Sequence, residues 1–469
     1  MKNLSKYREK SSVGRSGRAF SAPRALRRGL RGGVLMGSLL LAAALLAGSP
    51  AAAADRGLNV VLVSVNSLRA DHLAAYGYQR ATTPAIDRLA GEGTVFERAF
   101  TQSSWTLPAL ASLFTSRYPV SHGVYERGQR VPARLLTLAE ALKAGGWRTG
   151  AFTGGLDMAG LHGLSRGFDV YDDETGAAPM GSFRDLAPRA LRWLADGAGA
   201  KSFLFVDAYD VHPPFDKPWP GGKQPEYDGP LKGLRLDYAL LKSYPWGGAR
   251  PADLDYVRAA YDAGVSWADG AIGELLKGLD GLGLSSSTVV ILTSEHGEEL
   301  GERGSFDRYG RASLHDEVVR VPLIIRHPAW PPGRRADAQA RLIDIMPTVL
   351  DLLGLPPYSG AQGASLVKPL PAGSPGPDVY AESGADKCIL RTPDWKLVRT
   401  GARYQLFDLA ADPGEISDAA PAQPGRAYGL AQRLVKWRRE AARGGEQAVP
   451  RVELTPEMRR KLAEAGYWQ

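Results

Sequence analysis

The stretch Val289-Val290-Ile291-Leu292-Thr293-Ser294-Glu295-His296-Gly297 changes abruptly from an apolar run to a carboxylate, a histidine and a glycine. The apolar run predicts a strand buried on both faces, and polar groups just past the carboxyl end of such a strand face the ligand crevice of an α/β sheet. Glu295 and His296 are of types that bind divalent metals, and Gly297 permits a sharp turn beside them. Considered alone, the stretch fits a metal site and a solvated strand end equally well.

Similar transitions occur at two other predicted strand ends. The apolar run 58–65 ends at Asn66 and is followed by Arg69, and the run 203–206 leads into the proline-rich loop that carries His212. A histidine that is merely packed is less expected in such a loop than in a core, so a site role is favoured for His212. A helix is predicted to begin near Thr106, where a hydroxyl can cap the helix or face an anion, because free backbone N–H groups gather there.

Strands alternate with helices along most of the chain. This order predicts an α/β fold with a large, mostly parallel sheet covered by helices on both faces. A segment rich in proline and glycine, residues 367–378, is expected to lead into a smaller C-terminal α+β domain. The predicted parts are a leader at 1–54, a main domain at 55–366, a smaller domain at 367–440, and a tail with a final helix at 441–469. Strands are expected at 149–153, 320–326, 378–382 and 395–400, and helices at 135–144, 256–279 and 342–353.

The first 54 residues have the layout of a secretory signal: a basic arm, an apolar run at 34–47 and four alanines at 51–54. Cleavage near Ala54 and export to the periplasm or the exterior are expected. The apolar run is short for a membrane span, so no stable span is expected after cleavage, and an uncleaved anchor is the alternative. The leader holds ten of the 58 Lys and Arg and one of the 50 acids. The remainder is therefore nearly neutral, and nucleic acid is not an expected partner.

An ordered set of motifs runs from Leu58 to Trp468. With these motifs the chain resembles the sulfatase family of the alkaline phosphatase superfamily, over nearly its whole length after the leader. The resemblance implies a fold of that type and hydrolysis of sulfuric or phosphoric esters as the family's activity. The motifs lie at residues 67–73, 105–108, 115–119, 122–124, 166–169, 210–212, 293–297, 320–325, 406–409 and 465–467.

The resemblance places Thr106 where family sulfatases carry the cysteine or serine that is converted to formylglycine. It also places Leu110 where the same signature has an arginine. No formylglycine is therefore expected, although other members of the superfamily use a threonine alkoxide as nucleophile. His212 and His122 are carried over with Thr106 as catalytic positions. Arg69, Arg303 and Arg311 could direct positive charge toward a bound sulfate or phosphate, a role that suits the guanidinium fork. For any single one of them, a surface charge or a carboxylate partner is the commoner role.

The metal positions implied by the resemblance are Asn66, Glu295 and His296. The family has an aspartate where Asn66 stands, and an Asp-His or Asp-Asn pair where Glu295 and His296 stand. Asn66 removes one negative charge from a site for a hard cation, and Glu295 moves the carboxylate by about 1.5 Å, one C–C bond. The resemblance implies calcium as the divalent metal, and these replacements predict that it binds weakly or not at all.

Three functions are compatible with this sequence. The first is an exported pseudoenzyme that keeps the sulfatase fold and a cleft for small-molecule or glycan sulfate or phosphate esters. The second is a metal-dependent hydrolase of sulfuric or phosphoric esters with Thr106 as nucleophile, and the third is a scaffold in an assembly. Loss of the convertible nucleophile, its arginine and the first metal aspartate together favours the first. The fold by itself does not decide, because function resides in the site.

Overall fold

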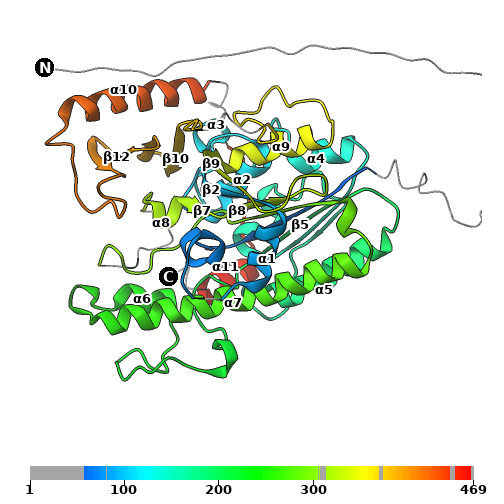
Figure 1. Ribbon diagram of the computed structural model, residues 1–469, viewed down its shortest axis with the longest axis horizontal. Helices are drawn as coiled ribbons and strands as arrows, with labels where there is room; N and C mark the ends of the chain where they lie inside the picture. The colour runs from blue at the N-terminus through cyan, green and yellow to red at the C-terminus, as the bar shows by residue number, and fades with distance from the viewer. Residues whose placement is uncertain are drawn as a thin grey trace, which may run out of the picture. The chain divides into compact units, whose positions relative to one another are not determined.

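A nine-stranded mixed sheet forms the centre of the computed structural model (Figure 1). The described residues are 57–80, 82–304, 306, 313–368, 373–443 and 449–465, so the predicted leader lies outside them. The strand order within them is β4-β3-β5-β1-β6-β8-β2-β7, and β9 also pairs with β2. The strands are β1 (Asn59–Val65), β2 (Thr94–Phe100), β3 (Arg148–Thr153), β4 (Val170–Asp172), β5 (Ser202–Ala208), β6 (Thr288–Thr293), β7 (Arg320–Val321), β8 (Leu323–Arg326) and β9 (Arg334–Arg341).

The parallel strands β5, β1 and β6 bring their carboxyl ends to one edge of the sheet. Ser64 of β1 is level with Asp207 of β5 on one side and with Thr293 of β6 on the other. The three strands are completely buried, as their apolar runs predict. Side chains that follow these strands, including Asn66, therefore gather at one place.

Helices cover both faces of the sheet because the strand residues alternate between two cores. Val61 and Val63 of β1 pack with α1 (Pro84–Glu92), α5 (Phe183–Asp196) and α7 (Pro251–Gly281). Val60 and Leu62 pack on the other face. The helices on that face include α2 (Thr106–Thr115), α4 (Leu138–Ala144), α9 (Ile345–Leu352) and α11 (Pro456–Glu464). The α/β fold class predicted from the sequence is confirmed.

The sheet differs from the expectation in its second half. The predicted strand 320–326 is two short strands, β7 and β8, separated by Pro322, which has no N–H to give to a sheet ladder. The strands β2 and β9 were not predicted, and β2 runs antiparallel to β7 and β8. The predicted helix 342–353 begins as a 3-10 turn before α9.

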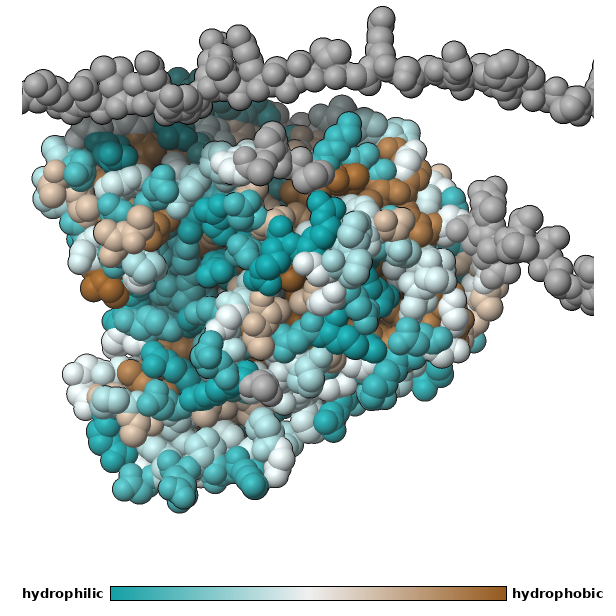
Figure 2. Space-filling view, in the orientation of Figure 1, coloured by the Kyte–Doolittle hydropathy of each residue, from teal (hydrophilic) through white to brown (hydrophobic). Residues whose placement is uncertain are grey.

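A four-stranded antiparallel sheet and one long helix form the smaller C-terminal α+β part, as expected. Leu430 and Leu434 of the helix pack on the sheet beside Cys388. The expected boundaries at 54, 366 and 440 stay predictions. No helix in the described part of the chain is long and apolar enough to cross a membrane, and on the face in Figure 2 the apolar patches are small and separated. The elements are β10 (Val379–Ser383), β11 (Lys387–Arg391), β12 (Trp395–Thr400), β13 (Arg403–Asp408) and α10 (Pro424–Ala441).

A buried lysine joins this second sheet to the rest of the protein. The ammonium of Lys396 in β12 is fully buried and lies 2.9 Å from Asp316 of α8 (Asp316–Val319) and 2.8 Å from Glu415. Arg391 also pairs with Asp316, at 2.9 Å. The positive charges hold the pKa of the Asp316 carboxyl well below its ordinary value, against the opposing effect of burial.

We predict that Lys396→Met lowers the free energy of unfolding by about 3–5 kcal/mol, because it leaves the buried Glu415 without its lysine and removes one of the two cations that pair with Asp316. Urea unfolding of the variant measures this. The control Lys277→Met removes an exposed pair with Glu274 and should cost less than about 1 kcal/mol. Equal losses for the two variants would contradict this role of Lys396.

Candidate functional site

Four of the predicted site residues meet where the parallel strands end. Asn66 directly follows β1, Glu295 and His296 follow β6, and Thr106 is the first residue of α2. The exposed fractions are 0% for Asn66 and Glu295, 3% for Thr106 and 4% for His296. These residues are far apart in the sequence. They lie together because β1 pairs in parallel with β6 and because α2 packs on the face of the sheet formed by Val60 and Leu62.

The amide of Asn66 is the centre of the cluster. Its Nδ2 donates to Thr106 Oγ1 at 2.9 Å and also to Glu295 Oε1. Its Oδ1 accepts from the Ser67 hydroxyl at 3.1 Å, and Ser64 donates to the second Glu295 oxygen at 3.0 Å. The nitrogen of the amide, rather than its oxygen, therefore faces the carboxylate and the threonine hydroxyl.

His296 completes the hydrogen bonds of Thr106. Its Nδ1 lies 2.7 Å from the Gly297 carbonyl, which can only accept, so Nδ1 carries the proton. Its Nε2 is then an acceptor for the Thr106 hydroxyl, at 3.2 Å. Burial lowers the pKa of His296 to about 4, so the ring is neutral at pH 7. The Thr106 hydroxyl does not cap α2, although capping was one expectation for it.

Asp207 is a site residue that the sequence reasoning missed. It is fully buried, level with Ser64, and neither carboxyl oxygen has a hydrogen-bond partner among the described residues. Burial and the neighbouring Glu295 raise its pKa well above the ordinary value. Burial also raises the pKa of Glu295 to about 7. Two carboxyl groups thus lie in the same buried region.

His212 is connected to the cluster through a second chain of side chains. Its Nε2 lies 3.4 Å from the hydroxyl of Tyr238 in α6 (Tyr238–Ser243), and Tyr238 donates to Glu298 at 3.0 Å. The Ser67 hydroxyl also lies 3.2 Å from Glu298 and so links this chain to Asn66. Burial lowers the pKa of His212 to about 3. Tyr238, Glu298 and Ser67 were not predicted as site residues.

His122 is not part of the cluster. Its Nε2 lies 3.0 Å from the hydroxyl of Ser112, in the second half of α2, and its Nδ1 accepts from the backbone of Val124. Burial lowers its pKa to about 3. These contacts hold α2 against α3 (Pro119–His122).

Two of the predicted ligand-binding arginines form ion pairs with acidic side chains. Arg69 is bidentate to Asp71, at 2.9 and 2.7 Å, and also donates to Glu302 at 2.6 Å. Arg303 donates to Glu317 at 3.0 and 3.2 Å. Arg311 lies outside the described residues.

The residues of the cluster do not fit a divalent cation. Among the described residues there is no group of three or more His, Cys, Asp or Glu side chains placed to hold one. The Glu295 carboxylate is bonded by a serine hydroxyl and an amide N–H, both of which are donors. Hard cations require oxygen ligands. In this arrangement the Asn66 nitrogen, which is a donor and not a metal ligand, lies between the oxygens of Thr106 and Glu295.

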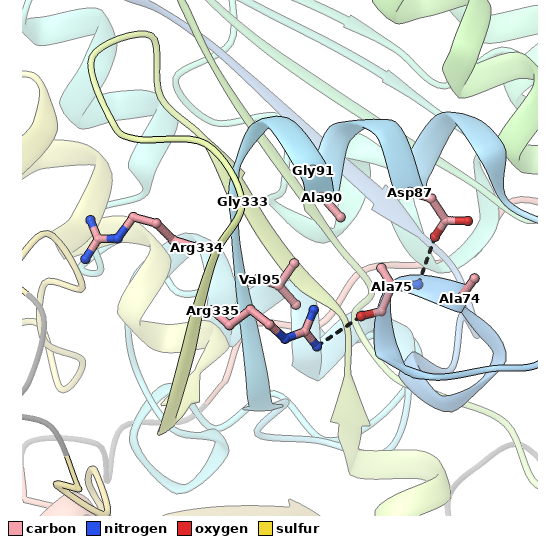
Figure 3. Close-up of a pocket in the computed structure, with 9 residues that line it drawn as sticks. All are labelled: Ala74, Ala75, Asp87, Ala90, Gly91, Val95, Gly333, Arg334 and Arg335. Carbon is pink, nitrogen blue, oxygen red and sulfur yellow. Dashed lines mark hydrogen bonds between the residues drawn. The ribbon is translucent and has the colours of Figure 1, made fainter.

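The hollow drawn in Figure 3 lies at a different place, beside α1 and β9. Its polar groups bind one another: Asp87 accepts from the backbone of Ala75 at 2.8 Å, and Arg335 donates to the Ala75 carbonyl at 3.1 Å. Arg335 also donates to Glu97 at 2.6 Å. Asp87 and Arg335 therefore already have hydrogen-bond partners within the protein.

Glu298 gives the site a measurable pH dependence, because burial raises its pKa to about 8. Its contribution to stability is present below the unfolded pKa, near 4.5, and is lost as the pH rises through about 8. We predict that the free energy of unfolding of the wild type falls by several kcal/mol relative to Glu298→Gln between pH 5 and pH 9, since one pKa unit corresponds to about 1.4 kcal/mol. Urea unfolding at pH 5, 7 and 9 measures this. A constant difference between the two proteins would contradict the burial of an ionisable Glu298.

Comparison with curated proteins gives relatives over most of the chain. Arylsulfatase K of Rattus norvegicus is 24% identical over 468 residues, covering 86% of this chain and 82% of the relative. The multifunctional alkaline phosphatase superfamily protein PehA of Trinickia caryophylli is 27% identical, covering 81% and 95%.

Solved structures agree on the fold. The phosphonate monoester hydrolase of Agrobacterium radiobacter superposes with a TM-score of 0.67 at 24% identity and covers 82% of this chain and 96% of its own. At that identity the likeness concerns the fold alone. The family model described as Sulfatase matches residues 58–355. This chain belongs to the sulfatase family.

Proposed function

We propose that this protein has lost the metal-dependent hydrolysis of its family and acts as an exported binding protein for sulfated or phosphorylated ligands. The observation that carries the proposal is the position of the Asn66 nitrogen, which donates to both Thr106 and Glu295. The residues at the family's metal and nucleophile positions lie together, but they satisfy one another by hydrogen bonds without a cation.

The consequence for Thr106 is chemical. A threonine hydroxyl is a weak nucleophile until a metal or a base removes or polarises its proton. The N–H of Asn66 carries no full charge, and Glu295, with a pKa of about 7, is partly protonated near neutral pH. Neither group supplies the positive charge that a metal contributes. The threonine at position 106, where the family has a convertible cysteine or serine, supports the same proposal.

The ligand class and the export rest on other grounds. The relatives include proteins named for action on aryl sulfates, which supports a sulfate or phosphate ester as ligand. Arg69 and Arg303 are paired with acids, so other cations must supply most of the charge that holds it. Export is inferred from the basic arm, apolar run and alanine cluster of the leader.

A second function is favoured by the contact of Thr106 with His296. A hydroxyl 3.2 Å from an unprotonated ring nitrogen, on a ring held by the Gly297 carbonyl, is the arrangement of a nucleophile and its base. The second function is therefore ester hydrolysis with Thr106 as nucleophile and without a metal. The pKa of His296, about 4, makes it a weak base at neutral pH, which is why we rank this function second.

We predict that Asn66→Asp creates metal binding that the wild type lacks. The new carboxylate would replace the amide donor between Glu295 and Thr106, and with His296 it would offer three ligand side chains. We expect the melting temperature of the variant to rise by at least about 3 °C in millimolar calcium or manganese, by preferential binding to the folded state. The wild type should not respond. Asn59→Asp is the control, because the same change is then made at the opposite, buried end of β1. Stoichiometric metal in the purified wild type would overturn the proposal.

Thr106→Ala separates the two functions. Under the first, turnover of aryl sulfates and aryl phosphate diesters by the wild type is near background, and the substitution changes nothing. Under the second, turnover without metal falls by about a thousandfold or more in Thr106→Ala, because the covalent route is removed. It should be retained in part by Thr106→Ser, which keeps the hydroxyl. Robust wild-type turnover that depends on Thr106 would therefore replace the first function by a hydrolase.

A further inference from the structure

The outer face of α10 carries an unusual concentration of positive charge. Between Arg426 and Arg443 the sequence has six Lys and Arg and one acid, Glu440. Lys436, Arg439 and Arg443 are spaced i, i+3 and i+7, so they lie on one side of the helix and of the turn that follows it. All three are exposed, and within the described residues none of them has an ion-pair partner within 4 Å.

A groove runs along one side of this charged face. It has a volume of about 270 Å³, and none of the described residues that line it is acidic. Arg399 of β12 donates to the Gly401 carbonyl at 2.9 Å, so its charge is not balanced by an acid there. Arg438 donates to the Ala385 carbonyl and lies 3.4 Å from Glu382. We call this groove the α10 groove; its lining residues are Val120, Arg399, Leu434, Val435, Arg438, Arg439 and Ala442.

The hollow beside Arg69 provides a contrast. It is lined by four arginines, including Arg320 and Arg391, and by four acids, including Asp316 and Glu317, and several of these groups pair with one another. Its charge is therefore balanced within the protein. The α10 groove has no acid in its lining, and although Arg438 pairs with Glu382, Arg399 and Arg439 have no ion pair within the described residues, so their charge is directed outward.

We infer that the α10 groove and the adjacent Lys436 and Arg443 bind a sulfated polysaccharide. A linear polyanion can place one sulfate group between Arg399 and Arg439, where guanidinium forks bind it, and lay the next groups along the cations of the helix. The exposed apolar side chain of Val435 is available to contact the sugar ring between two sulfates. This site uses no residue of the Thr106 cluster, and it supplies cations for an anionic ligand that Arg69 and Arg303 do not.

The composition of the face favours a polysaccharide over two other polyanions. A membrane-bound helix turns an apolar stripe outward, whereas Leu430, Leu434 and Ala441 of α10 face inward and are buried. Single-stranded nucleic acid needs aromatic platforms on which bases stack. Trp437 is already stacked on Tyr380, with ring centroids 4.1 Å apart, which leaves Tyr428 as the exposed aromatic residue of this helix.

The test compares two triple variants with the same change in net charge. Lys436→Glu/Arg439→Glu/Arg443→Glu removes the charged face, and Lys223→Glu/Lys232→Glu/Arg235→Glu alters three exposed cations in the segment before α6. The probe is a heparin oligosaccharide of defined length, with binding followed by calorimetry at several salt concentrations. We expect the dissociation constant to rise at least tenfold in the first variant and less than about threefold in the second. The slope of log K against log salt should fall by about three in the first, one for each lost cation.

A second variant distinguishes the loss of a binding residue from the loss of the folded structure. Arg399→Gln changes a residue of the α10 groove outside the helix, and it should weaken heparin binding at least about threefold while the far-ultraviolet circular dichroism spectrum is unchanged. Desulfated heparin should not bind the wild type. The inference is overturned if the two triple variants bind heparin equally, if desulfated heparin binds as well, or if the wild type binds phosphatidylserine vesicles or single-stranded DNA more tightly than heparin. None of these outcomes depends on Thr106, so the proposed loss of hydrolysis is tested separately.

Discussion

One amide group determines the character of the buried site. The NH₂ of Asn66 lies between the Glu295 carboxylate and the Thr106 hydroxyl and satisfies both. Because a buried acceptor without a partner is costly, these bonds fix β1, the segment after β6 and the start of α2 relative to one another. The same amide holds Ser67, and through it the second chain of side chains that reaches Glu298. A substitution of Asn66 is therefore expected to alter the hydrogen bonds of most polar groups in the site.

The pKa values of the site are shifted mainly by burial. A metal would keep neighbouring carboxylates ionised, since opposite charge stabilises the charged form. Here burial raises the pKa of Glu295 and Asp207. The histidines respond in the opposite direction, because burial also disfavours their charged form, and His296 is neutral at pH 7. The interior of the site thus tends toward neutrality near pH 7.

The sequence predicts the α/β fold and the meeting of Asn66, Thr106, Glu295 and His296, because apolar strand runs end in polar groups at the same edge of a parallel sheet. It does not reveal Asp207, which is one polar residue at the end of an apolar run. Only the pairing of β5 with β1, which puts Asp207 level with Ser64, places it in the site. The strand β9 was missed because its charged residues hide the apolar pattern. The prediction that the arginines bind a ligand rests on their residue type alone. The sequence does not show that Arg69 pairs with Asp71 and Glu302.

The position of β1 in the sheet also constrains the order of events after synthesis. This strand is made early, but its partners β5 and β6 begin only at Ser202 and Thr288. The backbone N–H of Glu382 donates to the Gln102 carbonyl, so the segment just before Thr106 gains its last neighbour only when the second sheet exists. Contacts between residues so distant in sequence slow folding, since long loops must close before the contacts form. A chain that completes its core this late stays unfolded, and exposed to other chains and proteases, for longer.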